Sequence, residues 1–213
     1  MCGEYGSMPV IGDPAPDFEA VTTNGAMKLS DLKGMWVVMF SHPADFTPVC
    51  TTEFIAFSQI ADDLQKLNVQ LVGLSIDSVH SHLAWIRNVR EKMGVDIPFP
   101  IIADLDMKVA KKYGMIHPGQ SSTATIRTVF FIDDKGILRA MIYYPLTNGR
   151  YIPEILRLVK ALQTTDKYGV STPANWQPGD KVVVPAPKNK ADMEKRLSEG
   201  YECKDWYLCF KKV

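Results

Sequence analysis

The chain has 213 residues, of which 46% are hydrophobic and 23% charged, and its 24 lysines and arginines balance its 24 aspartates and glutamates. The balanced charge gives no indication of a nucleic-acid or anionic-membrane partner, and the longest apolar run, residues 35–40, is too short to span a bilayer. Because the N-terminus also lacks a basic start followed by an apolar stretch, we expect a cytoplasmic protein without a membrane partner.

Strand-like and helix-like segments alternate along the first half of the chain. Residues 17–32 carry Asn24-Gly25 between two short extended runs, a pattern typical of a hairpin. Apolar runs of buried-strand length then alternate with segments whose apolar residues recur at helical spacing. This order predicts parallel strands in a central sheet covered on both faces. The expected strands are residues 35–41, 69–76 and 99–104, and the expected helices are residues 54–67, 78–94 and 105–114.

The pattern changes after residue 126. Residues 127–144 hold two β-rich runs around the sequence Asp-Asp-Lys-Gly, which predicts an antiparallel hairpin. A helix with a buried stripe is expected within residues 149–169. Taken together, the order of elements resembles an α/β thioredoxin-like fold with an N-terminal hairpin.

The composition shifts again near the end of the last long helix. Four prolines between residues 173 and 187 exclude a long helix there and favour an extended arm. A short charged helix is expected over residues 189–199, followed by an aromatic-rich tail that docks on its own chain or on a partner subunit. We therefore expect a thioredoxin-like domain over residues 1–165 and a C-terminal arm over residues 166–213, because this length fits one core with an appendage better than two domains.

The cysteines do not form the pattern of a disulfide framework. They are too few and too scattered for one in a chain of this length. No Cys-x-x-Cys or His-x-x-x-His pair occurs, and His80 and His82 do not share a helix face, so no metal site is expected. The four cysteines are Cys2, Cys50, Cys203 and Cys209.

Cys50 lies in a segment, TPVCTTE, that is built like the start of a helix. Thr47 is a natural N-cap, Pro48 suits the first helical position, and Cys50 then takes the third. Unpaired backbone N–H groups and the positive end of the helix dipole favour a thiolate there. Glu53, one turn further, is placed to anchor a cationic side chain near the sulfur. By position alone, an activated cysteine and a small buried hydrophobic residue are equally consistent with this pattern.

The segment FSHPADFTPVCTTEF, residues 40–54, resembles the active-site motif of the peroxiredoxins, P-x-x-x-T-x-x-C. Pro43, Thr47 and Cys50 occupy the motif positions. The surrounding residues resemble the one-cysteine subfamily, including its archaeal members that carry extra C-terminal cysteines. Similar segments, among them GLSID, FPIIAD, VFFIDDKG and EILRLVKALQ, extend the resemblance over nearly the whole chain.

This resemblance implies a thiol-dependent peroxidase that acts on hydrogen peroxide and alkyl hydroperoxides without a cofactor. Cys50 would be the peroxidatic nucleophile, Thr47 would contact the peroxide, and Pro43 would shield the sulfur from water. Arg127 would match the active-site arginine of the family, which supports both the thiolate and the transition state. Glu53 would orient that arginine.

The resemblance also places His42 near the active site as a substrate contact. A histidine beside a proline in a turn is as often a plain hydrogen-bonding residue, so both interpretations of His42 stay open.

A sulfenic acid on Cys50 has to be resolved before it oxidises further. By resemblance to the archaeal members, Cys203 would be the resolving residue, and Cys209 would be a second exchange partner that passes the disulfide outward. Two packed thiols are the alternative, and Cys2 is expected to have no role. The electrons would come from a thioredoxin-like protein or a small thiol. The resemblance further implies a homodimer, assembled into a ring of dimers such as a decamer, with the arm taking part in dimerisation.

Three other functions fit the sequence less well. A thiol–disulfide oxidoreductase of this fold needs Cys-x-x-Cys, but Thr47 stands three residues before Cys50. The lipase-like activity of some relatives needs a serine where this chain has Met35. A chaperone or scaffold ring stays open, and peroxide consumption with and without Cys50 distinguishes it from an enzyme.

Overall fold

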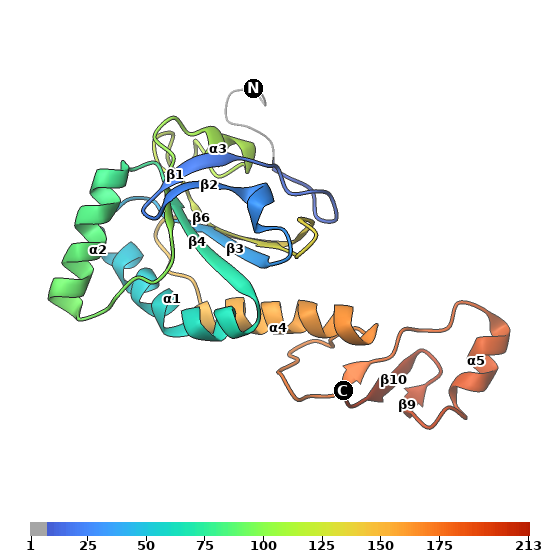
Figure 1. Cartoon of the computed structure of the whole chain (residues 1–213). Helices are drawn as coiled ribbons and strands as arrows, with labels where there is room; N and C mark the ends of the chain where they lie inside the picture. The colour runs from blue at the N-terminus through green and yellow to red at the C-terminus, as the bar shows by residue number, and fades with distance from the viewer. Residues whose placement is uncertain (1–7) are drawn as a thin grey trace. The chain divides into compact units, whose positions relative to one another are not determined.

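The computed structural model of the chain describes residues 8–213 (Figure 1). Internal contacts divide it into two compact units, one ending at Ile152 and the other covering Pro153–Val213. Among residues 8–213, no helix combines the length and the apolar character that a membrane crossing requires. Cys2 lies outside the described residues.

The first unit is built on a seven-stranded mixed sheet with the strand order β2-β1-β5-β4-β3-β6-β7. β3 pairs in parallel with β4, and β4 pairs in parallel with β5. β6 lies antiparallel beside β3, and β7 lies antiparallel beside β6. The parallel centre, the antiparallel pair at one side and the N-terminal hairpin all agree with the prediction. The strands are β1 (Glu19–Thr22), β2 (Gly25–Lys28), β3 (Trp36–Ser41), β4 (Val69–Ser75), β5 (Ile101–Ala103), β6 (Arg127–Ile132) and β7 (Leu138–Tyr144).

A helix follows each of the three parallel strands. α1 (Pro48–Lys66) follows β3, α2 (Val79–Met93) follows β4, and α3 (Lys108–Lys112) follows β5, while the 3-10 helix η1 (Leu29–Leu32) precedes β3. α2 ends as predicted at a glycine, where Gly94 takes the left-handed conformation with φ 69°. α3 is shorter than the expected 105–114, because Met107 is itself left-handed (φ 57°) and the helix starts only after it.

The two faces of the sheet carry different parts of the core. Alternate residues of β3, such as Val37 and Met39, pack on one face with side chains from β4, β6 and α3. On the other face, the ring of Phe40 stacks on Phe57 of α1 with 4.0 Å between centroids, and it meets Phe54 edge to face at 5.2 Å. This aromatic contact anchors α1 against the end of β3, and it therefore sets the path of the loop between them.

The second unit contains α4 (Ile152–Tyr168) from its second residue onwards, α5 (Lys190–Arg196) and a three-stranded antiparallel sheet with the order β8-β10-β9. Its strands are β8 (Val182–Val183), β9 (Glu202–Asp205) and β10 (Leu208–Lys211). A separate small core forms from Ala161, Val170, Trp176 and Val182. The helix α5 agrees with the prediction, whereas the sheet was not predicted, because its strands of two to four residues carry too little periodicity to be recognised. The boundary expected at residues 165/166 falls inside α4, and the domain assignment stays a prediction.

Candidate active site

Cys50 lies in the first turn of α1, directly after the loop that leaves β3. Thr47 is the N-cap residue, with extended backbone angles, and Pro48 is the first helical residue, as the sequence predicts. The Thr47 side chain does not cap the helix, however, since its hydroxyl donates to the carbonyl of Ala44 at 2.8 Å. Cys50 is a free cysteine with 0% of its surface exposed.

Arg127 brings a positive charge to the sulfur. It is the first residue of β6, the antiparallel neighbour of β3, and it is buried. Its Nη1 donates to Cys50 Sγ at 3.4 Å and to Glu53 Oε2 at 2.7 Å, and its Nε donates to the carbonyl of Leu146 at 2.9 Å. The guanidinium is thus held from two sides while it faces the sulfur.

A second arginine, Arg150, completes the binding of Glu53. Arg150 donates to both Glu53 carboxylate oxygens, from Nε at 2.9 Å and from Nη2 at 2.7 Å, and its backbone N–H adds a third bond at 2.9 Å. Its Nη1 also donates to the carbonyls of Ser41 and Thr128, both at 2.8 Å. Arg150 therefore ties the ends of β3 and β6 to α1.

Sequence reasoning missed Arg150. The one available signal is Glu53: a glutamate on a buried helix face needs enough positive charge and enough donors for all its lone pairs. Burial by itself raises the pKa of Glu53, but the charge and hydrogen bonds of Arg150, followed by the charge of Arg127, hold the pKa below its usual value. Burial lowers the pKa of Arg150, and Glu53 offsets part of that shift.

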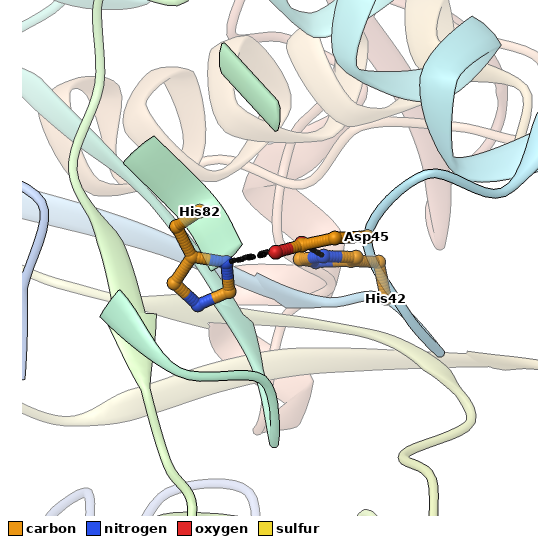
Figure 2. Close-up of side chains that lie close together, drawn as sticks. All are labelled: His42, Asp45 and His82. Atoms are coloured by element: carbon orange, nitrogen blue, oxygen red, sulfur yellow. Dashed lines mark hydrogen bonds and ion pairs between the residues drawn. The ribbon is translucent and has the colours of Figure 1, made fainter. Parts of the chain in front are cut away.

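A second buried polar group lies beside the same helix, formed by His42, Asp45 and His82 (Figure 2). Asp45 lies between the two imidazoles: His42 Nε2 is 3.0 Å from Oδ1, and His82 Nδ1 is 2.8 Å from Oδ2. His82 Nε2 faces the carbonyl of Ile102 at 3.1 Å, whereas His42 Nδ1 has no hydrogen-bond partner. The His42 ring packs against Phe54, one turn after Cys50 on α1, with 4.7 Å between centroids.

Sequence reasoning did not indicate this group, since Asp45 and His82 are 37 residues apart along the chain. Burial lowers the pKa of His42, and the hydrogen bond and charge of Asp45 offset part of that shift. Burial alone raises the pKa of Asp45, but the hydrogen bonds from His42 and His82 bring it well below its usual range. The ligand atoms lie within 4.8 Å of one another, so the three residues are the candidates for a metal ion among residues 8–213, although the sequence predicted no metal site. The observed hydrogen bonds account for the Asp45 carboxylate without a metal.

The structure brings together Cys50, Glu53 and Arg127, with Thr47 three residues before the sulfur in the same turn. Pro43 is half-buried in the loop before α1. His42 is not bonded to Cys50, because Nε2 faces Asp45 and Nδ1 has no partner. Their roles in a reaction stay predictions.

The two C-terminal cysteines form a disulfide with each other, within the second unit. They lie directly opposite one another on β9 and β10, with 4.0 Å between Cα atoms. The sequence did not predict this pairing, because it depends on the register of two strands that were not recognised. The expected pairing of Cys203 with Cys50 stays a prediction.

A cysteine at the N-terminus of a helix, facing a guanidinium on a neighbouring strand of a thioredoxin-like sheet, defines a thiol-dependent enzyme. Comparison with known proteins identifies which one. Residues 11–141 match the AhpC/TSA family, and residues 161–200 match the C-terminal domain of 1-Cys peroxiredoxin. The chain belongs to the peroxiredoxin family and is a thiol peroxidase.

Relatives and solved structures agree over nearly the full length. A peroxiredoxin of Aquifex aeolicus is 62% identical over 99% of this chain and 100% of the relative. Peroxiredoxin 2 of Caldanaerobacter subterraneus is 60% identical over 97% of this chain and 94% of the relative. The structure of a yeast mitochondrial 1-Cys peroxiredoxin, described for its thiol resolution by glutathione and thioredoxin systems, has a TM-score of 0.86 at 43% identity, covering 97% of this chain and 100% of that one. These similarities confirm the predicted family and fold.

Replacing Glu53 with glutamine should destabilise the protein strongly. The change leaves two buried guanidiniums without their shared counter-charge, and removing one partner of a buried pair costs about 3–5 kcal/mol. The free energy of unfolding from urea titration at pH 7 measures the effect. Glu91→Gln, which removes the exposed ion pair with Arg87, is the matched control and should change that free energy little. Equal effects of the two substitutions would show that the buried pair is unimportant.

The free energy of unfolding should also decrease as the pH falls below about 6.5, because the pKa of His42 is lower in the folded protein than in the unfolded chain. Its folded pKa lies below the ordinary value of 6.5, so the unfolded chain takes up a proton that the folded protein does not. The stabilisation is complete above pH 6.5 and is lost towards the lower folded pKa, at up to about 1.4 kcal/mol per pH unit. The lowered pKa values of Asp45 and Glu53 contribute only below about pH 4.5.

Urea titrations at pH 7.5 and 5.5 measure this dependence. The control is His42→Gln, which keeps an N–H donor for Asp45 but does not titrate in this range. The wild type should lose more stability between the two pH values than the variant does. Equal losses would rule out His42 as the source.

Proposed function

We propose that Cys50 reduces hydrogen peroxide and alkyl hydroperoxides by attack of its thiolate on the peroxide oxygen. The sulfur becomes a sulfenic acid, the O–O bond breaks, and water or an alcohol leaves after taking up a proton. The observation that carries the proposal is the 3.4 Å contact from Arg127 Nη1 to Cys50 Sγ. A guanidinium there stabilises the thiolate before the reaction and the developing negative charge on the leaving oxygen during it.

The other residues of the motif have supporting roles in this proposal. Thr47 already uses its hydroxyl proton on Ala44, so its remaining lone pairs are free to accept the hydrogen of a peroxide and to orient it. Glu53 fixes the direction of Arg127. Pro43 limits the access of water to the sulfur, and His42 contributes to substrate binding.

We extend the proposal to the C-terminal cysteines. The thiol of Cys203 attacks the sulfenic acid of Cys50, which releases water and forms a disulfide, and Cys209 then displaces Cys50 to give the Cys203–Cys209 pair. The disulfide between Cys203 and Cys209 in the structure supports this sequence of steps. A thioredoxin-like protein or a small thiol returns two electrons, in keeping with the yeast mitochondrial relative, whose thiol is resolved through glutathione and thioredoxin systems.

We also propose how the chain is organised in the cell. The chain functions in the cytoplasm as a homodimer assembled into a ring of dimers. Residues 1–165 form the peroxidase domain, and residues 166–213 form an arm for dimerisation and resolution. The match of residues 161–200 to the C-terminal domain of 1-Cys peroxiredoxin supports a separate role for the arm.

Cys50→Ser should abolish peroxide consumption, because serine is not ionised at neutral pH and is a far weaker nucleophile. The loss of hydrogen peroxide, followed with dithiothreitol as the reductant, measures the activity. Cys2→Ser is the matched control and should keep it. Residual consumption by Cys50→Ser at the wild-type rate would contradict the proposed function and would favour a scaffold role.

Cys203→Ser should allow a single turnover and then stop when a protein dithiol is the only reductant. The first equivalent of peroxide is consumed by Cys50, but no resolving thiol follows. Stoichiometric peroxide and mass spectrometry of the product measure this, with a sulfenic or more oxidised Cys50 as the expected species. Sustained turnover would show that Cys203 is not required for resolution.

A further inference from the structure

The two cysteines of the C-terminal disulfide lie in different surroundings. Cys203 is on β9, an edge strand of the small sheet, whereas Cys209 is on β10, which lies between β8 and β9. Cys209 has 0% of its surface exposed, while Cys203 is only half-buried and is flanked by the exposed Glu202 and Lys204. A molecule that approaches from solvent therefore reaches Cys203 and not Cys209.

The polar atoms around the Cys209 sulfur reinforce this difference. The carbonyl oxygen of Asp205 lies 3.4 Å from Cys209 Sγ, and that of Trp206 lies 3.9 Å away. Carbonyl oxygens accept a hydrogen bond from a thiol but repel a thiolate. Because the thiolate is the reactive form in disulfide exchange, a reduced Cys209 is held in the less reactive form as well as out of reach.

We propose that Cys203 is the only sulfur of this pair that exchanges with an external thiol, and that Cys209 acts as its internal partner. The external partner is a dithiol reductant, which attacks Cys203 on the exposed edge strand. The inference rests on the proposed function only because it assumes that the Cys203–Cys209 pair is redox-active. It differs from the expectation from sequence that Cys209 passes the disulfide outward.

The electrons and protons balance in two exchange steps. One thiolate of the reductant forms a bond to Cys203 Sγ, the Cys203–Cys209 bond breaks, and Cys209 takes the electron pair and a proton to become a thiol beside the Asp205 carbonyl. The second thiolate of the reductant then attacks the reductant's own bonded sulfur, and Cys203 leaves with the electron pair and takes up a proton. The reductant ends as a disulfide, and both cysteines end as thiols.

Two single-thiol variants test the difference in reactivity. In a chain that carries Cys2→Ser and Cys50→Ser, the further change Cys209→Ser leaves only the Cys203 thiol, and Cys203→Ser leaves only Cys209. We expect the Cys203 thiol to react with 5,5′-dithiobis(2-nitrobenzoic acid) at least about tenfold faster than the Cys209 thiol, because access and thiolate fraction both favour it. The same two chains in urea should react at similar rates, which ties the difference to the fold. Equal rates in the folded chains, or a faster Cys209, would overturn the proposal.

A trapping experiment keeps the disulfide intact and does not depend on the fold of the single-thiol variants. The Cys2→Ser/Cys50→Ser chain, oxidised with diamide, is mixed with an excess of a Cys-x-x-Cys protein whose second cysteine is replaced by serine, and the mixture is quenched in acid. Peptide mass spectrometry should find the probe on Cys203, with Cys209 as a free thiol. A probe found on Cys209 would overturn the proposal. Neither experiment uses peroxide, so their failure is distinct from a failure of the Cys50→Ser test.

Discussion

One buried carboxylate organises the centre of this protein. Glu53 accepts hydrogen bonds from Arg127 and Arg150, and all three side chains are almost fully buried. Burying an unpaired charge is costly, so the shared negative charge of Glu53 stabilises both guanidiniums in their buried positions. Arg127 also contacts Cys50. The carboxylate of Glu53, which directs the Arg127 guanidinium towards the sulfur, therefore comes from α1, the same helix that carries Cys50.

The main chain around this centre is shaped by packing on either side. Phe40 at the end of β3 packs on α1, and Arg150 lies over the same ring with 5.2 Å from its central carbon to the ring centroid. Between β3 and α1, the exposed Phe46 adopts a left-handed conformation with φ 54°, an unfavourable one for a non-glycine residue. The hydrogen bonds of Asp45 to His42 and His82, and of its backbone N–H to Asp77, hold the turn in this shape. The chain therefore enters α1 with Thr47 and Cys50 in the same turn.

The second unit uses a different kind of constraint. Its sheet has short strands and few buried apolar residues, and a covalent bond joins its edge strand to its central strand. The bond joins two residues in opposite pairing positions, so the register of β9 and β10 decides whether the cysteines meet at all. The same register places one sulfur at an accessible edge and the other inside the sheet.

The sequence determined the order of the long elements, because buried strands and amphipathic helices differ in their periodicity. It also determined the helix start at Thr47 and Pro48 and the family motif around Cys50, since these depend on neighbouring residues. Short strands and helix ends were less predictable: α3 begins late because Met107 is left-handed, and the C-terminal sheet carries no clear pattern.

Only the tertiary structure decided which distant residues share a site. Arg127 was expected there by resemblance, but Arg150 joins it because the segment before α4 places Arg150 on Glu53, 97 residues away along the chain. The His42–Asp45–His82 group and the Cys203–Cys209 bond likewise depend on which segments lie side by side. The local sequence determines whether each segment favours a helix or a strand. Contacts between distant residues depend instead on packing and strand register, which cannot be read from any single segment.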